Sequence, residues 1–289
     1  MAATATATAP ASPAKPRTAT AGLAARPPWW RRRWGLLGAR VGVGALILAV
    51  WALAAHFRWL PPELLPSPFA VARSFVELAF TLSFWTAFGQ TVLAALTGLG
   101  LSVLVGVPLG LALGMLPPVE RATRVLTDVG RSFPVIALLP VMILLLGVTT
   151  RMEITVIFLG VVWPILLQTT YGARRMDPVV RDTVRAYRTT VWLRFLKVVL
   201  PGAAPFIMTG VRVAASVSIL IAIGVEVLGR TPGMGLALGT AQVDGAPSIA
   251  LAYVIYAGLL GLTLNSLLQW FEDRVIVWNA RGDNEGRAS

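Results

Sequence analysis

Long apolar stretches alternate with short, arginine-rich polar segments along this chain. A helix that crosses a bilayer needs about 20 largely apolar residues. Six stretches meet this requirement, namely residues 34–56, 86–116, 132–150, 154–173, 205–228 and 246–271. We therefore predict an all-α polytopic membrane protein with six transmembrane helices, whose ends are placed to within several residues.

The composition agrees with this class of fold. Of the 289 residues, 56% are hydrophobic and only 13% are charged, and the mean hydropathy is +0.73. A soluble domain carries about 25% charged residues. We expect residues 34–280 to form one transmembrane domain. A disordered tail at 1–33, rich in Ala, Thr and Pro, precedes it, and a short tail at 281–289 follows it.

The distribution of positive charge predicts the orientation. Most of the 25 Lys and Arg residues lie before the first stretch, after the second and fourth stretches, and after the sixth. The opposite loops hold only Arg58, Arg73, Arg151 and Arg230. Because positive loops stay in the cytoplasm, we expect both termini and the segment 174–204 to be cytoplasmic. The net charge of +12 is then a topology signal, and we expect no nucleic-acid binding.

Missing residue types exclude several kinds of chemistry. The chain has no Cys and one His, so disulfides and zinc-type clusters are excluded. Its two Lys lie outside any phosphate-binding G-x-x-x-x-G-K-[ST] loop. The 13 acidic residues form no interfacial cluster of the kind that a membrane enzyme needs. We therefore expect a non-catalytic chain without a cofactor of its own.

The longest polar segment between apolar stretches, residues 176–212, has a helical pattern. Asp177-Pro178 is a typical helix start. Val180, Val184, Tyr187 and Val191 then form one apolar stripe, which Arg181, Arg185 and Arg188 flank. Thr189-Thr190 interrupts the pattern, and a second short helix is expected from Val191 until Pro201 ends it. Such a loop either fixes topology and contacts anionic lipid or binds a partner in water.

This segment resembles the EAA loop of membrane subunits in ATP-binding-cassette (ABC) importers. The family pattern begins with Asp-Pro, continues with Glu-Ala-Ala and Gly, and ends in Leu-Pro. Here Asp177-Pro178 and Leu200-Pro201 have the family spacing, Asp182 stands for Glu, and Arg188 stands for Gly. The resemblance implies a helix that sits in a cleft of a cytoplasmic ATPase. The implied coupling residues are Asp182, Arg185, Ala186, Tyr187, Arg188, Thr189 and Thr190.

A second resemblance lies in the third apolar stretch. Arg131, Pro134, Ala137, Pro140 and Gly147 match a pattern of the alkanesulfonate, taurine and nitrate branch of these permeases. Residues 229–247 also resemble a Gly-rich segment of that branch. The prolines equally predict a kinked helix, and a kink is one way to shape a pathway. The resemblance implies a small anion such as a sulfonate, taurine or nitrate as cargo.

The resemblance also implies the fold and the partners. It implies a type I importer permease fold in a bacterial inner membrane, in contact with lipid. A second permease copy, expected to be identical, would complete the pathway. Two cytoplasmic ABC ATPases would bind ATP and Mg, and an extracytoplasmic solute-binding protein would deliver cargo. A secondary transporter or channel is the alternative, although it should concentrate ionisable groups at mid-membrane.

Polar residues inside the apolar stretches are candidates for the translocation pathway. They are Gln90 with its neighbour Thr91, Gln168, Arg212, Glu226 and Asn265. Arg212 and Glu226 are about 21 Å apart on a helix, so they cannot pair. Arg212 is expected to be a structural anchor at the inner headgroup level or to form a salt bridge near Asp182. Glu226 can face either the pathway or the outer interface.

Overall fold

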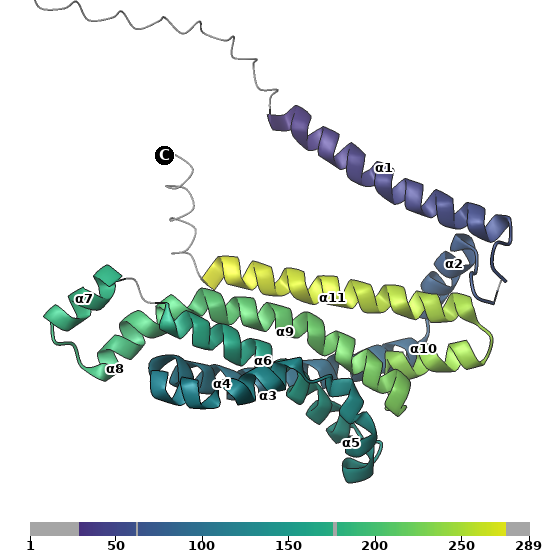
Figure 1. The fold of residues 1–289 in the computed structure, drawn as a ribbon. Helices are drawn as coiled ribbons and strands as arrows, with labels where there is room; N and C mark the ends of the chain where they lie inside the picture. The colour runs from purple at the N-terminus through teal and green to yellow at the C-terminus, as the bar shows by residue number, and fades with distance from the viewer. Residues whose placement is uncertain (1–28, 62, 176–177, 276–289) are drawn as a thin grey trace, which may run out of the picture. The chain divides into compact units, whose positions relative to one another are not determined.

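The computed structural model describes residues 29–61, 63–175 and 178–275, and every regular element in these ranges is helical. This confirms the predicted all-α class. The elements, drawn in Figure 1, are α1 (Trp29–His56), α2 (Pro68–Ala79), α3 (Leu82–Met115), α4 (Pro117–Ser132), the 3₁₀ helix η1 (Val135–Leu138), α5 (Leu139–Leu146), α6 (Thr150–Arg174), α7 (Pro178–Ala186), α8 (Val191–Arg194), the π-helix η2 (Phe195–Val199), α9 (Leu200–Gly229), α10 (Met234–Val243) and α11 (Pro247–Val275).

The chain divides into two compact units after Trp51. Most of helix α1 belongs to the first unit, and its stretch Gly38–His56 is long and apolar enough to cross a bilayer. The helix begins at Trp29, five residues before the start of the first predicted span. The predicted tails at 1–33 and 281–289 lie largely outside the described residues, and nothing here tests them.

Helices α3 and α6 form a tight parallel pair in the second unit. Four glycines of α3, spaced by four or eight residues, face α6 as Gly98 meets Ile157, Gly106 meets Ile165, Gly110 meets Thr169 and Gly114 meets Ala173. A Cβ atom on Gly110 would lie 2.7 Å from the Leu166 carbonyl oxygen. Small residues at such a seam let two backbones approach closely. Both residue numbers rise together along the seam, so the two helices run in the same direction.

The third predicted span, residues 132–150, is broken rather than kinked. Helix α4 and the stretch Val135–Leu146 meet at an angle of 83°. Phe133, between them, is extended, because the residue before a proline avoids the helical region. The second arm is roughly 20 Å long, which is shorter than the apolar core of a bilayer, about 30 Å. The kink that the prolines predicted is therefore a break between two helices.

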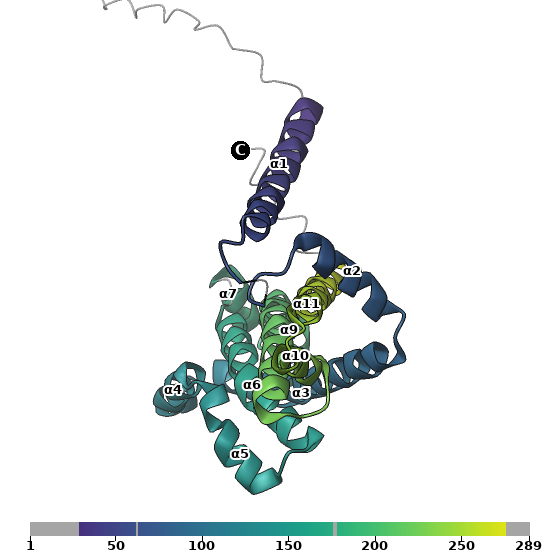
Figure 2. The same ribbon diagram turned by 90° about the vertical axis from the view of Figure 1, so that its right-hand side faces the viewer.

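The direction of α3 and α6 nevertheless requires a crossing between them. Five helices of the described residues can span a bilayer, or six if the bent pair α4 and α5 counts as one span. Parallel neighbours start on the same side of the membrane, so residues 116–149 must return the chain from one side to the other. The bent pair therefore supplies this crossing. Figure 2 shows α4 on the outer side of α6.

Helix α9 packs antiparallel to α6 and completes the core. Gly172 of α6 contacts Phe206, and Gly160 of α6 contacts Ile221. The helical path continues without a stop from Val191 through η2 into α9. The prediction that Pro201 ends the second short helix was therefore wrong. Pro201 cannot donate a hydrogen bond, and the wider π-turn that ends just before it lets the helix continue.

The remaining helices close the end of the bundle where α9 finishes. Helix α10 lies against α3, α9 and α11, where Met234 and Leu238 pack with Phe84 and Tyr253. Helix α2 lies against α11, because the Tyr256 hydroxyl donates to the Phe75 carbonyl oxygen at 2.7 Å. The short helices α7 and α8 lie at the opposite end of α9 (Figure 1).

Candidate functional site

Helix α7 presents the predicted apolar stripe on the surface. The helix begins at Pro178, the position predicted from the Asp-Pro start, while Asp177 lies outside the described residues. Val180 is 40% exposed and Tyr187 is 78% exposed, and Val191 at the start of α8 is exposed as well. This chain therefore leaves the stripe uncovered, which is unusual for an amphipathic helix of a folded protein.

A sharp turn separates α7 from α8. Arg188 has a φ angle of 47°, in the left-handed region that favours glycine. Thr190 then caps α8, because its hydroxyl accepts a hydrogen bond from the Leu193 backbone N–H. Arg188 is the residue that replaces the family Gly. The turn thus has the backbone geometry that a glycine would adopt, although an arginine occupies it.

The implied coupling residues lie on α7 and in this turn. Asp182, Ala186, Tyr187, Arg188 and Thr190 are exposed, and Thr189 is half-buried. The side chains of Arg181 and Arg185 lie outside the described residues. The exposed residues of α7, of the turn and of the start of α8 form one small, accessible segment, which we call the α7 surface. Asp182 lies on the other side of the helix from the apolar stripe, because two residues of advance turn an α-helix by about 200°.

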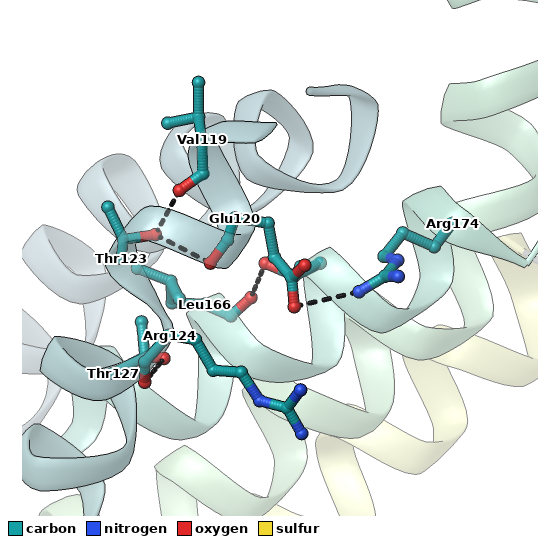
Figure 3. Close-up of polar contacts among 8 residues, drawn as sticks. Val119, Glu120, Thr123, Arg124, Thr127, Leu166 and Arg174 are labelled. Carbon is teal, nitrogen blue, oxygen red and sulfur yellow. Dashed lines mark hydrogen bonds and ion pairs between the residues drawn. The ribbon is translucent and has the colours of Figure 1, made fainter. Parts of the chain in front are cut away.

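An ion pair joins the start of α4 to the end of α6 beside this segment. The Arg174 Nη1 atom lies 2.9 Å from the Glu120 Oε1 atom, and Figure 3 shows the two side chains reaching toward each other. Arg174 is the last residue of α6 before the polar segment. A cavity of about 590 Å³ lies next to it, lined by Gly114, Arg174, Arg194 and Val199 among others. Sequence reasoning did not predict this pair.

The candidate pathway residues are spread along the bundle. Gln90 is exposed and lines a hollow of about 440 Å³ with Thr86 and Tyr253. Gln168 of α6 is half-buried against Gly210 of α9. Asn265 is half-buried on α11. The structure brings none of these three side chains together.

Arg212 forms an ion pair with Glu272 of α11. Both side chains are partly buried, at 32% and 18% exposure. Arg212 was predicted to form a salt bridge near Asp182. Its partner is Glu272 instead, and Asp182 is exposed on α7. A charged arginine within a membrane-spanning helix is costly unless it pairs, and here the carboxylate comes from the neighbouring helix. The pair therefore fastens α9 to α11 in the half of the bundle that carries α7.

Glu226 lies at the other end of α9 and is fully buried. Its Oε2 atom accepts a hydrogen bond of 2.6 Å from the Gly235 N–H, at the start of α10. The adjacent Met234 N–H donates to the Thr91 hydroxyl at 2.9 Å. Glu226 is therefore enclosed within the bundle and does not reach the outer interface. It binds the first turn of α10.

Glu153 of α6, which sequence reasoning overlooked, lies beside Glu226. It is 1% exposed, and the two carboxyl groups are close enough to interact. The signal was present, because Glu153 is the single acidic residue of the membrane-spanning helix α6. Its importance depends on a contact between residues far apart in sequence.

The amino-acid sequence of this chain is similar to those of known transport proteins. The family model described as "binding-protein-dependent transport system inner membrane component" matches residues 106–277. The chain is 31% identical to the aliphatic sulfonates transport permease protein SsuC of Escherichia coli (strain K12), over 81% of this chain and 89% of that protein. It is 30% identical to the nitrate import permease protein NrtB of Leptolyngbya laminosa, over 64% and 63%.

The fold also matches a solved transporter. A chain of the MetNI methionine ABC transporter, solved in inward-facing conformations, superimposes with a TM-score of 0.53. The match covers 73% of this chain and 96% of that chain at 18% identity. This identity supports a shared fold and nothing finer. The predicted type I importer fold is thereby confirmed.

Proposed function

The chain belongs to the family of binding-protein-dependent transport system inner membrane components, and we propose how its geometry serves that role. It is a multi-pass membrane permease subunit of an ABC importer. The predicted resemblance to the sulfonate and nitrate branch is confirmed. These relatives favour the importer over the alternative of a secondary transporter or channel.

The α7 surface is the docking site for the ATPase in this proposal. The observation that carries it is an exposed apolar stripe on the segment that has the family's coupling-loop spacing. A partner that covers Val180 and Tyr187 would remove them from water, which is a favourable contribution to association. The ATPases, one for each permease copy, would bind ATP and Mg, and this chain would bind neither.

Helix α9 would carry the motion of the ATPases into the membrane. A nearly continuous helical path joins Val191 of α8 to Gly229 at the end of α9. A displacement of α7 and α8 therefore acts on the same rigid element that holds Arg212 and Glu226. Such shifts of packed helices can switch a cavity between inward and outward access.

The membrane orientation places the α7 surface in the cytoplasm. Arg174 and Arg194 line one cavity with Val191 at the end of the bundle that carries α7, and positive residues stay on the cytoplasmic side. With six crossings both termini are cytoplasmic, and the α10 end faces the delivering binding protein. One copy supplies half of a pathway, so we propose a homodimer in a bacterial inner membrane.

The cargo in this proposal is a small anion such as a sulfonate, taurine included, or nitrate. The named cargo of SsuC and NrtB supports this class. Among the basic residues in the described spans of the second unit, Arg212 is the one that is not exposed, and it is already paired with Glu272. The permease therefore offers no free buried cation there, and we assign selection among anions to the binding protein that delivers them.

Co-purification with the cognate ABC ATPase in nanodiscs tests the docking site. We expect wild type to retain the ATPase and Asp182→Arg to lose it, because an added positive charge disrupts the α7 surface. Asp244→Arg is the matched control, since Asp244 is also exposed but lies after α10. Its complex should stay intact.

Two results would contradict the proposed docking site. One is equal ATPase retention by wild type and Asp182→Arg. The other is equal loss in Asp182→Arg and Asp244→Arg, which would indicate general damage from added charge. Transport of a radiolabelled sulfonate or nitrate into vesicles, driven by ATP and the binding protein, then tests the cargo class separately.

A further inference from the structure

Two glutamates on different helices are buried side by side at the α10 end of the bundle. Glu153 of α6 is 1% exposed and Glu226 of α9 is fully buried. Their carboxyl groups are close enough to interact, and the buried Thr231 hydroxyl faces Glu153. Ionisable groups buried in a membrane-spanning domain are costly in free energy, so their presence points to a functional role.

Three buried oxygen atoms of this cluster lack a hydrogen-bond partner. They are Glu153 Oε1, Glu226 Oε1 and Thr231 Oγ1. An ionised carboxylate only accepts hydrogen bonds. Two ionised carboxylates that face each other therefore cannot satisfy one another. A single proton between them would turn one acceptor into a donor and supply the missing bond.

The surroundings offer no positive side chain to neutralise two charges. Helices α3, α5 and α10 contain no ionisable residue, and α11 contributes only Tyr253 and Tyr256 at this end. Arg151 of α6 and Arg230 after α9 are exposed. In the part of the chain that the structure describes, neither arginine forms an ion pair with Glu153 or Glu226.

The contacts of Glu226 indicate which carboxyl keeps its charge. Glu226 accepts the short hydrogen bond from Gly235 and lies at the positive end of α10. A second proton would forfeit this charge-assisted bond. With no proton, two negative charges would be buried together without a partner. One proton, carried by Glu153 and donated toward Glu226, is the state that fits both constraints.

We propose that Glu153 and Glu226 form a proton-binding site, in which one shared proton keeps α10 seated on the bundle. When this proton leaves to water, two adjacent negative charges repel each other. Glu226 then moves away from Glu153 and no longer holds the Gly235 N–H in place. The Met234 bond to Thr91 is next to it, so the first turn of α10 loosens as a unit.

Infrared spectroscopy of the full-length permease in nanodiscs tests the shared proton. At neutral pH we expect a protonated-carboxyl band, with the usual small shift in D₂O, that is absent from Glu153→Gln and retained in Glu226→Gln. Glu120→Gln is the control, because Glu120 lies apart from this cluster in an ion pair with Arg174, and its spectrum should keep the band.

Three results would overturn the proposal. The first is a wild-type spectrum without a protonated-carboxyl band. The second is a band that persists in Glu153→Gln. The third is a pair of ionised carboxylates whose bands shift with Na⁺, which would indicate a metal cation in place of the proton. The wild-type measurement decides even if a variant fails to fold.

Hydrogen exchange of the Met234 and Gly235 amides tests the link to α10. On raising the pH, we expect their exchange in wild type to outpace that in Glu153→Gln by roughly tenfold or more, the factor for losing one charge-assisted hydrogen bond. The variant cannot gain the second charge, and comparison at equal pH cancels the chemical pH dependence. Equal rates in both proteins at every pH would overturn the role of the proton in seating α10.

Discussion

Helices α7 and α10 are both short and sit at opposite ends of α9, yet their surroundings differ. The first turn of α10 is bonded to Glu226 and Thr91, and Met234 is almost fully buried. The α7 surface leaves Tyr187 and Val191 in the open. One helix is held by its own chain, while the other has an apolar face that its own chain does not cover.

This difference separates two tasks that one helix bundle has to perform. A coupling element must bind and follow a partner, so its binding energy has to remain available until that partner arrives. An element that closes the far end must keep its position while the partner moves. Helix α9 connects the two, so substitutions at its two ends should have opposite signatures in stability and in partner binding.

The largest expected effect is on the seating of α10. Gly235→Ala would place a Cβ atom 2.5 Å from the Ile223 carbonyl oxygen and 2.7 Å from Glu226 Cβ. Backbone contacts of this kind cannot relax cheaply, so we expect a loss of about 3 kcal/mol of stability. Thermal unfolding of the purified chain in detergent measures it.

Gly239→Ala on the same helix is the matched control for this prediction. Its Cβ atom would meet only Val227 Cγ1, at 3.9 Å. Alanine is the better helix former, so the control should be neutral or slightly stabilised. Equal destabilisation by both substitutions would show that α10 tolerates no added methyl group, and that the close seat of Gly235 is not special.

The next effect is on partner binding at the α7 surface. Tyr187→Ala should weaken ATPase binding by about 2 kcal/mol, or roughly thirtyfold, with little change in the stability of the free chain. Titration of the ATPase onto nanodisc-held permease measures the affinity. Val243→Ala, equally exposed but at the end of α10, should bind as wild type does. A stability loss in Tyr187→Ala alone would contradict an uncovered surface.

Much of this comparison could be predicted from the sequence, because it depends on local patterns. The apolar runs predicted the long helices, the Asp177-Pro178 start and the apolar stripe predicted α7, and Thr189-Thr190 predicted the interruption after it. Arg188, which stands in place of the family Gly, lies at a backbone position with a positive φ angle, as Arg58 and Arg230 also do. These features are set by residues within one or two turns of each other.

The features that could not be predicted depend on packing between distant segments. Glu153 and Glu226 come together only because α6 and α9 pack antiparallel. Arg212 likewise pairs with Glu272 only because α9 packs against α11. The break at Pro134 was taken for a kink, because a proline pattern does not specify the bend angle. Pro201 was taken for a helix end, because a π-turn is rare and has no simple sequence signal.

A smaller effect is expected for the ion pair that fastens α9 between its two ends. A double-mutant cycle with Arg212→Met and Glu272→Met should give a coupling energy of about 1 kcal/mol in unfolding experiments. The pair Arg131 and Asp128, with side chains at 56% and 50% exposure, is the control cycle and should give a coupling near zero. Equal couplings would indicate that burial adds nothing to the first pair.

The smallest effect is expected at the turn after α7, and its measurement separates the stability of α7 from its binding of the partner. Arg188 has a left-handed backbone conformation, which costs an L-residue about 1 kcal/mol. Arg188→Gly should remove this cost, but the greater conformational freedom of glycine in the unfolded chain offsets part of the gain. We expect a net gain of about 0.5 kcal/mol in local stability, measured by hydrogen exchange of α7 and α8. Tyr187→Gly is the control and should lose stability, because its backbone gains nothing from glycine. If Arg188→Gly also lowers ATPase binding, the arginine side chain itself contacts the partner; unchanged binding with the stability gain would limit its role to the turn.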